Sequence, residues 1–316
     1  MKRALIIGGG GFAGGYLIRE LSSNGYEVHA TCLPGEEIAG DCTVYSLDIG
    51  QMAEIEAVIA QVSPEVIFHL AAQSSVAVSW QKPALTAQVN VVGAVNVLEA
   101  VRLSKRPDTR LLLIGSGEEY GFIAKDACPL SEEEKLRPGN IYAATKVCQE
   151  MIGQIYSRSY GMDIVMTRSF NHTGPGQSPT FVVSEICRQI AEAELPGAPA
   201  EVRIGNLAAK RDFTDVRDVV RAYRLLAEKG MAGRVYNVGR GQAVAISEIM
   251  DTALSMSEAP IVVIQDAKRM RASDIPIIEP DVSLIFADTG WKAQISLRET
   301  VRDTLEWWRK KLHGSY

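Results

Sequence analysis

The stretch Arg3-Ala-Leu-Ile-Ile7-Gly8-Gly-Gly-Gly11-Phe12-Ala13-Gly14 places an apolar run directly before glycines at positions 8, 11 and 14. An amphipathic run, Tyr16-Leu-Ile-Arg-Glu-Leu21, follows the last glycine. In a strand–loop–helix unit of this kind, one glycine permits the tight turn, one lets the backbone approach a pyrophosphate, and one lets the helix pack close to the strand. The start of the helix then offers free N–H groups to the phosphates. The stretch therefore predicts a dinucleotide-binding unit.

Five further strand-like runs follow, with helical patterns between several of them, at residues 26–31, 44–49, 66–72, 111–114 and 163–167. This order predicts an α/β fold, a Rossmann doubly wound sheet with parallel strands and right-handed crossovers. From about residue 175 the elements become shorter. We expect a Rossmann domain over 1–174 that regains about 212–242, and a smaller C-terminal α/β substrate lobe over 175–316 after the chain has crossed back.

The composition is that of an ordinary soluble protein, 47% apolar and 22% charged. A net charge of −5 gives no reason to expect nucleic acid or an anionic membrane as a partner. No apolar run approaches the roughly 18 to 20 residues of a membrane helix, and the N-terminus has no signal-peptide pattern. Five scattered cysteines and four histidines show no metal-ligand spacing. We expect a cytoplasmic protein with reduced thiols and no metal.

The end of the second strand leaves the choice of cofactor open. A carboxylate there would select NAD by bonding the ribose 2′-hydroxyl, and an arginine would favour NADP. The sequence has neither, since it reads Ala30-Thr31-Cys32, and no Lys or Arg occurs between Arg19 and Lys82. Thr31 and loop amides suit NADH or NADPH alike. Asp48, at the end of the third strand, is either a partner for the adenine amino group or a plain loop residue.

A candidate catalytic group lies in the middle of the chain. The run Leu111-Leu-Leu-Ile114 predicts a buried strand that delivers Ser116 to its carboxyl end. Tyr142 and Lys146 are four residues apart, so on a helix they share one face. An ammonium beside a phenol lowers its pKa from near 10, so that the phenol can exchange a proton with a sugar hydroxyl or carbonyl. Ser116 would hydrogen-bond the same oxygen.

Three other segments are candidates for substrate contacts. The polar loop Gln73–Trp80 follows the fourth strand, and Arg168–Gln177 is a glycine–proline loop that favours neither helix nor strand. Its amide and imidazole donors suit an anionic, polyhydroxylated ligand. Lys268, Arg269 and Arg271 form a small basic cluster that is either solvated surface or a diphosphate clamp, with Arg211 as its other side.

The glycine trio, Asp48, Ser116, Tyr142-x-x-x-Lys146 and Arg211-Asp-Phe-Thr-Asp-Val216 occur in the order typical of the extended short-chain dehydrogenase/reductase superfamily, which the whole chain resembles. Ala72–Trp80 and Ser169–Pro179 resemble the GDP-mannose branch of 4,6-dehydratases and GDP-6-deoxy-D-lyxo-4-hexulose reductases. The second motif is most similar to the reductases, which make GDP-D-rhamnose, whereas dehydratases usually have Asn-His-Glu-Ser-Pro there.

This resemblance implies an NADPH- or NADH-dependent enzyme that reduces the C4 ketone of a GDP-4-keto-6-deoxyhexose. Tyr142 would be the proton donor, Lys146 its pKa modulator and ribose ligand, and Ser116 the carbonyl hydrogen-bond donor. The dinucleotide would lie along Gly8, Gly11, Phe12, Ala13, Gly14, Thr31, Asp48, Ile49, Leu70, Ala71 and Ala72. The substrate would be held by Gln73, Ser74, Asn171, Arg211 and Arg271.

One departure keeps the dehydratase as an alternative. Dehydratases carry Thr-Ser/Asp-Glu where this chain has Ser116-Gly117-Glu118, and their glutamate removes the C5 proton. Glu118 is therefore a fourth candidate catalytic residue, although Gly117 lacks a group to help the hydroxyl leave. Another nucleotide-sugar epimerase or reductase is a further alternative. A regulator that had lost catalysis would have a broken Ser/Tyr/Lys trio, which is intact here. The resemblance also implies a homodimer, paired through helices at 85–102 and 142–160.

Overall fold

The computed structural model describes residues 1–314 except 39, 107, 124–126 and 270–275. Strand β1 (Lys2–Ile7) lies inside its main sheet, and alternate side chains of this strand enter two different cores. Ala4 and Ile6 pack with helices α1 and α8 on one face, while Leu5 and Ile7 pack with α2 and α5 on the other. Both faces of the sheet are therefore covered, as an all-parallel sheet requires.

The main sheet has seven strands in the order β10-β6-β5-β4-β1-β2-β3, and all of its neighbours are parallel. This confirms the predicted α/β doubly wound fold. Its other strands are β2 (Tyr26–Cys32), β3 (Thr43–Ser46), β4 (Val66–His69), β5 (Arg110–Ser116), β6 (Ile164–Ser169) and β10 (Val235–Val238). Ligands of such sheets bind outside the carboxyl ends of the strands.

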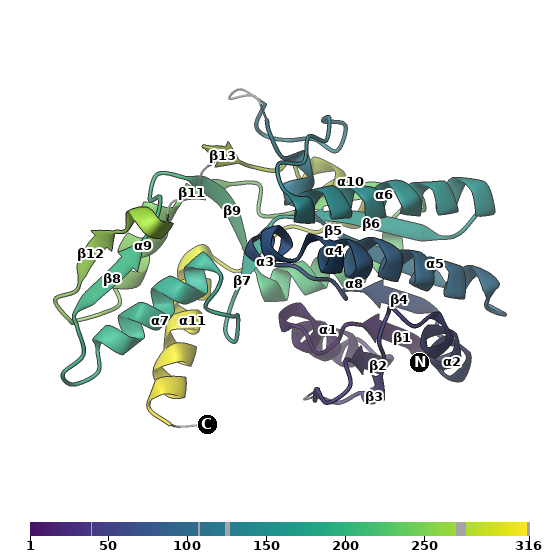
Figure 1. Ribbon diagram of the computed structural model, residues 1–316, viewed down its shortest axis with the longest axis horizontal. Coiled ribbons are helices and arrows are strands. Elements are labelled where there is room, and N and C mark those ends of the chain that lie inside the picture. Colours follow the sequence, from purple (N-terminus) through teal and green to yellow (C-terminus); the bar gives the residue numbers. More distant parts are fainter. Residues whose placement is uncertain (39, 107, 124–126, 270–275, 315–316) are drawn as a thin grey trace.

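Helices cover the sheet on both faces, and Figure 1 shows α5 and α6 running side by side. The helices of this lobe are α1 (Phe12–Ser23), α2 (Met52–Val62), α3 (Val76–Gln81), α4 (Pro83–Ala87), the π-helical turn η1 (Gln88–Val92), α5 (Gly93–Leu103), the 3₁₀ turn η2 (Gly117–Tyr120), α6 (Ile141–Tyr160), α8 (Val216–Lys229) and α10 (Ser283–Thr289). Helix α8 packs against α1 although some 200 residues separate them in sequence.

The smaller lobe stands beside this sheet in Figure 1 and has its own apolar core. Its helices are α7 (Val182–Ala193), α9 (Ile246–Leu254), α11 (Leu297–Leu312) and the turn η3 (Ala267–Arg269). Its strands are β7 (Asn171–Thr173), β8 (Glu201–Ile204), β9 (Lys210–Asp215), β11 (Ala243–Ala245), β12 (Val262–Gln265) and β13 (Ile277–Ile278). Strand β9 joins β7, β11 and β13 in one small sheet. The part of the chain that returns to the main lobe therefore begins at α8 and not at residue 212.

Several boundaries differ from those predicted. The third and fourth strands end at Ser46 and His69, so Asp48 and Ala71 lie in loops. The loop at 168–177, predicted to lack regular structure, contains part of β6 and the short strand β7. Helix α11 begins at Leu297, directly after Ser296, whose side chain caps the helix by accepting the Glu299 N–H. Such a side-chain cap marks a helix start more sharply than hydropathy does.

The helical run Pro83–Leu103 corrects another expectation. By length and composition it is apolar enough to cross a membrane, contrary to the prediction that no run approaches that length. Its middle carries Asn90, which is 0% exposed and hydrogen-bonded to Gln73 and to Thr145 of α6. The run also packs against α2 and α6, so its apolar side chains contribute to the core of the main lobe.

Candidate active site

The glycine loop between β1 and α1 makes close contacts that only glycine permits. Gly8 has a φ of +89°, and a Cβ atom there would lie 2.6 Å from the Ala71 backbone nitrogen. A Cβ atom on Gly14 would lie 2.2 Å from the Gly9 carbonyl oxygen. Gly11 precedes α1, and within the described chain no side chain caps this end of the helix. The cradle and the uncapped N–H groups fit an anionic pyrophosphate.

The segment after β4 forms the facing wall of this loop. The N–H groups of Leu70 and Ala71 both donate to the Ile7 carbonyl, each at 2.9 Å. Ala72 lies next to them and is half-buried. Small side chains at 71 and 72 keep this edge open, at the place where the carboxyl ends of β1 and β4 meet.

Three residues predicted to contact the cofactor have separate roles in the structure. Thr31 is 1% exposed, and its hydroxyl accepts the Gly8 N–H at 3.1 Å, so it fixes the glycine loop from below. Ile49 is buried beneath α5, where a Cβ atom on Gly93 would lie 2.6 Å from it. Asp48 is exposed, and its Oδ1 accepts the Gly50 N–H at 2.8 Å. Of the three, Asp48 alone presents an exposed polar group.

Ser116 and Tyr142 are hydrogen-bonded to each other at the carboxyl end of β5. Ser116 ends the strand, and its Oγ accepts the Glu118 N–H at 3.2 Å. Tyr142 lies in the first turn of α6, which is capped by Asn140. Burial raises the pKa of the Tyr142 phenol above its usual value of 10, and the Ser116 hydrogen bond opposes this rise. The phenol therefore keeps its proton at neutral pH and has a proton to donate.

Lys146 lies one helical turn after Tyr142, but its ammonium group points to β5. Its Nζ donates to the Ile114 carbonyl at 2.8 Å and to Gln149 Oε1 at 3.1 Å. The expected lowering of the Tyr142 pKa is not found, because burial of the phenol raises this pKa and the charges of Glu119 and Glu118 add to the rise. Burial also lowers the pKa of the Lys146 ammonium.

His69 is the last residue of β4. It lies close enough to Lys146 for the positive charge of the lysine to affect the pKa of the imidazole. Its side chain is 1% exposed. Within the described chain, neither ring nitrogen has a hydrogen-bond partner. Burial lowers the pKa of the imidazole to about 3, with Lys146 adding to the shift. His69 is therefore neutral at physiological pH.

Two carboxyl groups adjoin the Ser116–Tyr142 pair. Glu119 is 0% exposed, and its Oε1 accepts the Ser116 N–H at 2.6 Å, while Oε2 has no partner among the described residues. Burial, and then the charge of Glu150, raise the pKa of Glu119 well above its usual range. Glu118 is half-buried, and its Oε2 accepts from the Asn140 Nδ2 at 3.0 Å.

Gln73 was predicted to contact substrate, but its side chain is engaged within the protein. Its Nε2 donates to the Ser75 carbonyl at 3.1 Å and to Thr86 Oγ1 at 3.0 Å, and its Oε1 accepts the Ser75 N–H. The Asn90 amide holds the Gln73 backbone through both its oxygen and its nitrogen. Gln73 thus organises the loop before α3, and the exposed Ser74 is the candidate of the pair for a sugar contact.

The loop after β6 reaches the glycine loop. His172 stacks on Phe12 with ring planes 2° apart and centroids 6.3 Å apart, and the Tyr16 hydroxyl donates to the Pro175 carbonyl at 2.7 Å. Asn171 is exposed at the start of β7. The predicted substrate loop and the predicted dinucleotide loop are therefore in contact.

The predicted diphosphate clamp is described only in part. Arg211 lies in β9, which pairs with β7, and its NH1 donates to the Lys210 carbonyl at 2.8 Å. Arg269 forms an ion pair with Glu185 at 3.0 Å. Arg271 lies outside the described residues.

The sequence profile of the family described as GDP-mannose 4,6 dehydratase matches residues 5–304. The chain belongs to this family. A relative in Pseudomonas aeruginosa, GDP-6-deoxy-D-mannose reductase, is 33% identical over 79% of this chain and 82% of its own length. The enzymes of this group to which the chain is similar are NAD(P)-dependent nucleotide-sugar reductases, dehydratases and epimerases.

Two solved structures extend the family comparison to the fold. The structure of RMD from Pseudomonas aeruginosa, complexed with NADPH, has a TM-score of 0.89 and 29% identity, and covers 98% of this chain and 100% of that one. The Thermus thermophilus UDP-glucose 4-epimerase, in complex with NAD, has a TM-score of 0.86 and 26% identity, with 97% and 99% covered.

The sequence analysis did not identify several residues that lie in the candidate site of this chain. Glu119 had a signal, because Ser116-x-x-Glu119 is a capping-box pattern and both of its hydrogen bonds form around η2. Asn140 also had one, since an Asn just before a helical run is a favoured N-cap. Asn90 had none, because its partners Gln73 and Thr145 lie far away in sequence.

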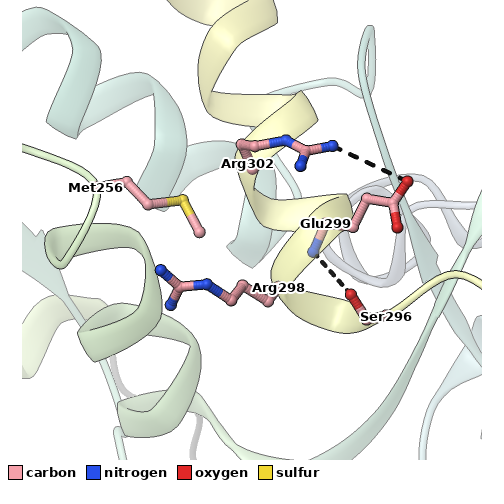
Figure 2. Close-up of a pocket in the computed structure, with 5 residues that line it drawn as sticks. All are labelled: Met256, Ser296, Arg298, Glu299 and Arg302. Carbon is pink, nitrogen blue, oxygen red and sulfur yellow. Dashed lines mark hydrogen bonds and ion pairs between the residues drawn. The ribbon is translucent and has the colours of Figure 1, made fainter.

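A separate pocket of about 230 Å³ lies at the start of α11. Figure 2 shows Met256 and Arg298 on one side, and Arg302 reaching toward Glu299. The Arg302–Glu299 ion pair measures 3.9 Å, and the Glu299 N–H is bound by Ser296. None of the residues predicted to act in catalysis or binding lines this pocket, so the candidate site remains the crevice of the main sheet.

Proposed function

We propose that this chain is an NAD(P)H-dependent reductase that converts the C4 ketone of a GDP-4-keto-6-deoxyhexose to an alcohol, of the type that makes GDP-D-rhamnose from GDP-4-keto-6-deoxymannose. The observation that carries the proposal is the Ser116–Tyr142 pair, in which the phenol retains its proton. The reductase relative and its solved counterpart support this choice of reaction.

Each of the three residues Tyr142, Ser116 and Lys146 has its own role in the proposed reduction. Tyr142 Oη donates its proton to the ketone oxygen as that oxygen gains charge, and Ser116 Oγ donates a hydrogen bond to it. The bound reduced nicotinamide supplies the hydride to C4. Lys146 holds a positive charge one turn away, which favours the phenolate that remains until a proton returns from solvent.

The alternative, a 4,6-dehydratase, is favoured by one observation. Glu118 is present and is oriented by Asn140, as a base for the C5 proton would have to be. Against this, a Cβ atom on Gly117 would lie 3.0 Å from the Phe170 ring, which leaves little room for a side chain that assists the leaving hydroxyl. The tight packing at Gly117 therefore favours reduction over elimination.

The test is an assay with two substrates. The chain is incubated with GDP-mannose and NADP⁺, and separately with GDP-4-keto-6-deoxymannose and NADH or NADPH, while absorbance of the reduced nicotinamide and product mass are followed. We expect cofactor oxidation only with the keto sugar, and a product with two more hydrogen atoms. Loss of water from GDP-mannose, with no net change in cofactor, would establish the dehydratase.

We also propose that the protein works as a homodimer in the cytoplasm, with no nucleic-acid or membrane partner. Helices α5 and α6 lie side by side and carry exposed apolar residues, among them Leu103, Met151, Ile155 and Tyr160. Such a surface suits pairing with a second copy as a four-helix interface. Sedimentation should show a dimer that Ile155→Lys weakens, and a wild-type monomer would refute the proposal.

A further inference from the structure

The strand that usually carries the cofactor-selecting residue ends here without a charge. Cys32 is the last residue of β2 and is 6% exposed. Its thiol donates to the Glu36 carbonyl at 3.3 Å, and burial raises the pKa of this thiol, so it stays neutral. The strand end therefore offers a ribose neither a carboxylate nor a cation.

The chain then turns back immediately. Leu33-Pro34-Gly35-Glu36 is a tight turn in which the Glu36 N–H donates to the Leu33 carbonyl at 3.0 Å. Gly35 has a φ of +86°, and Pro34 precedes it, which is the residue pattern of a type II turn. The sequence itself thus fixes where Glu36 lies relative to the end of β2.

The turn brings the Glu36 carboxylate over the glycine loop. Its Oε2 accepts the Leu33 N–H at 3.2 Å and lies 3.3 Å from where a Cβ atom on Gly10 would be. Among the described residues, no group donates to the second oxygen, Oε1. In a dinucleotide-binding unit of this kind, the adenosine ribose lies between the glycine loop and the end of the second strand.

The charged residues that flank Glu36 in the sequence are all of one sign. Residues 20–81 contain nine Asp and Glu residues and no Lys or Arg. Arg19, the nearest basic residue before them, lies over the Tyr16 ring at 4.6 Å. This segment therefore supplies no cation that could neutralise a phosphate on the ribose 2′ position.

We propose that Glu36 accepts a hydrogen bond from the adenosine 2′-hydroxyl and makes the protein select NADH over NADPH. This inference rests on the proposed function only in requiring a nicotinamide dinucleotide. A carboxylate beside a 2′-phosphate repels it and loses a hydrogen bond, which together should weaken NADPH about 10-fold or more relative to NADH. The chain would then differ from its Pseudomonas relative, whose structure contains NADPH.

The test measures binding without turnover. Dissociation constants for NADH and NADPH are determined from nicotinamide fluorescence at fixed ionic strength, with no sugar present. ADP-ribose and its 2′-phosphorylated form serve as competitors that probe only the adenosine half. We expect the wild type to favour the non-phosphorylated member of each pair about 10-fold or more. Glu36→Gln should bring the ratio to within about 3-fold of unity, mainly by tightening NADPH.

Glu37→Gln is the matched control, because it removes the same charge from the next exposed residue, and among the described residues Glu37 makes no contact with the glycine loop. It should leave the ratio within about 2-fold of the wild type. Equal or tighter binding of NADPH by the wild type would overturn the inference, and so would an equal effect of both substitutions. Failure of both dinucleotides to bind would overturn the proposed function as well.

Discussion

The Asn140 side chain donates from Nδ2 to Glu118 Oε2 at 3.0 Å, while its Oδ1 accepts the Ala143 N–H at 2.8 Å. One amide thereby joins the segment after β5 to the start of the helix that carries Tyr142. This cap holds the segment with Glu118 and the segment with Tyr142 in a fixed relation to each other. The role of Glu118 can therefore be tested separately from the placement of Tyr142.

Replacing Glu118 by Gln should change ketone reduction by less than about 5-fold, because reduction needs no base at C5. The amide keeps an oxygen that can accept from Asn140, so the geometry should survive. The measurement is kcat/KM with the keto sugar and saturating NADH. A collapse of activity would instead indicate elimination chemistry.

Tyr142→Phe should lower kcat by about 10³-fold, since the phenol is the proposed proton donor and general-acid catalysis contributes about 10² to 10⁴. Dinucleotide affinity should stay within a few-fold of the wild type, because the glycine loop is untouched. Stopped-flow kinetics and direct binding separate the two effects. Turnover similar to the wild type would remove Tyr142 from its assigned role.

Glu119 and Lys146 should determine the alkaline limit of activity together. Burial lowers the pKa of Lys146, and the Glu119 charge opposes this shift. Glu119→Gln removes that opposition, so the pKa of the lysine should fall further and the alkaline limb of the kcat/KM profile should move to lower pH. Glu118→Gln is the control, since Glu118 is not among the groups that shift Lys146. A limb that stays in place or moves upward would contradict the coupling.

His69 should make the fold sensitive to acid. Its pKa is about 3 in the folded protein and 6.5 ordinarily, so between these values the unfolded chain binds the extra proton. Stability is therefore retained above pH 6.5 and lost as pH falls below it, by roughly 3 kcal/mol at pH 4.5 from this group alone. His69→Leu should remove this part of the pH dependence.

Urea unfolding at pH 7 and pH 4.5 measures the His69 effect. The exposed His313 provides the control, since His313→Gln should leave the difference between the two pH values unchanged. An undiminished difference in the His69 variant would show that other groups cause the acid sensitivity.

The parallel sheet could be predicted because buried strands such as Leu111–Ile114 are continuous apolar runs between glycine loops and helices. The surroundings of the site could not, since they depend on partners distant in sequence. Gln73 looked like a ligand contact, yet Thr86 and Ser75 engage its amide. Lys146 looked like a neighbour of the Tyr142 phenol, yet its ammonium is bound by the Ile114 carbonyl.

The proposed role of Glu36 in cofactor preference shows the same limit on a shorter scale. Sequence reasoning infers the choice between NAD and NADP from the residue at the end of the second strand, which is Cys32 here. The carboxylate arrives four residues later, because the Pro34–Gly35 turn folds it back over Gly10. Only the turn geometry makes Glu36 a candidate.

Strand β10 forms the edge of the main sheet next to β6. Between these two strands the chain passes through α7, β8 and β9 of the smaller lobe. A protein ended near residue 174 would lose β10 and α8, leaving β6 with an unpaired edge and α1 without its packing partner. The main sheet is thus completed only by a part of the chain that follows much of the smaller lobe. Engineers could not graft a new sugar specificity onto this cofactor domain by exchanging halves between enzymes. They would have to change loops such as those around Ser74 and Asn171 in place.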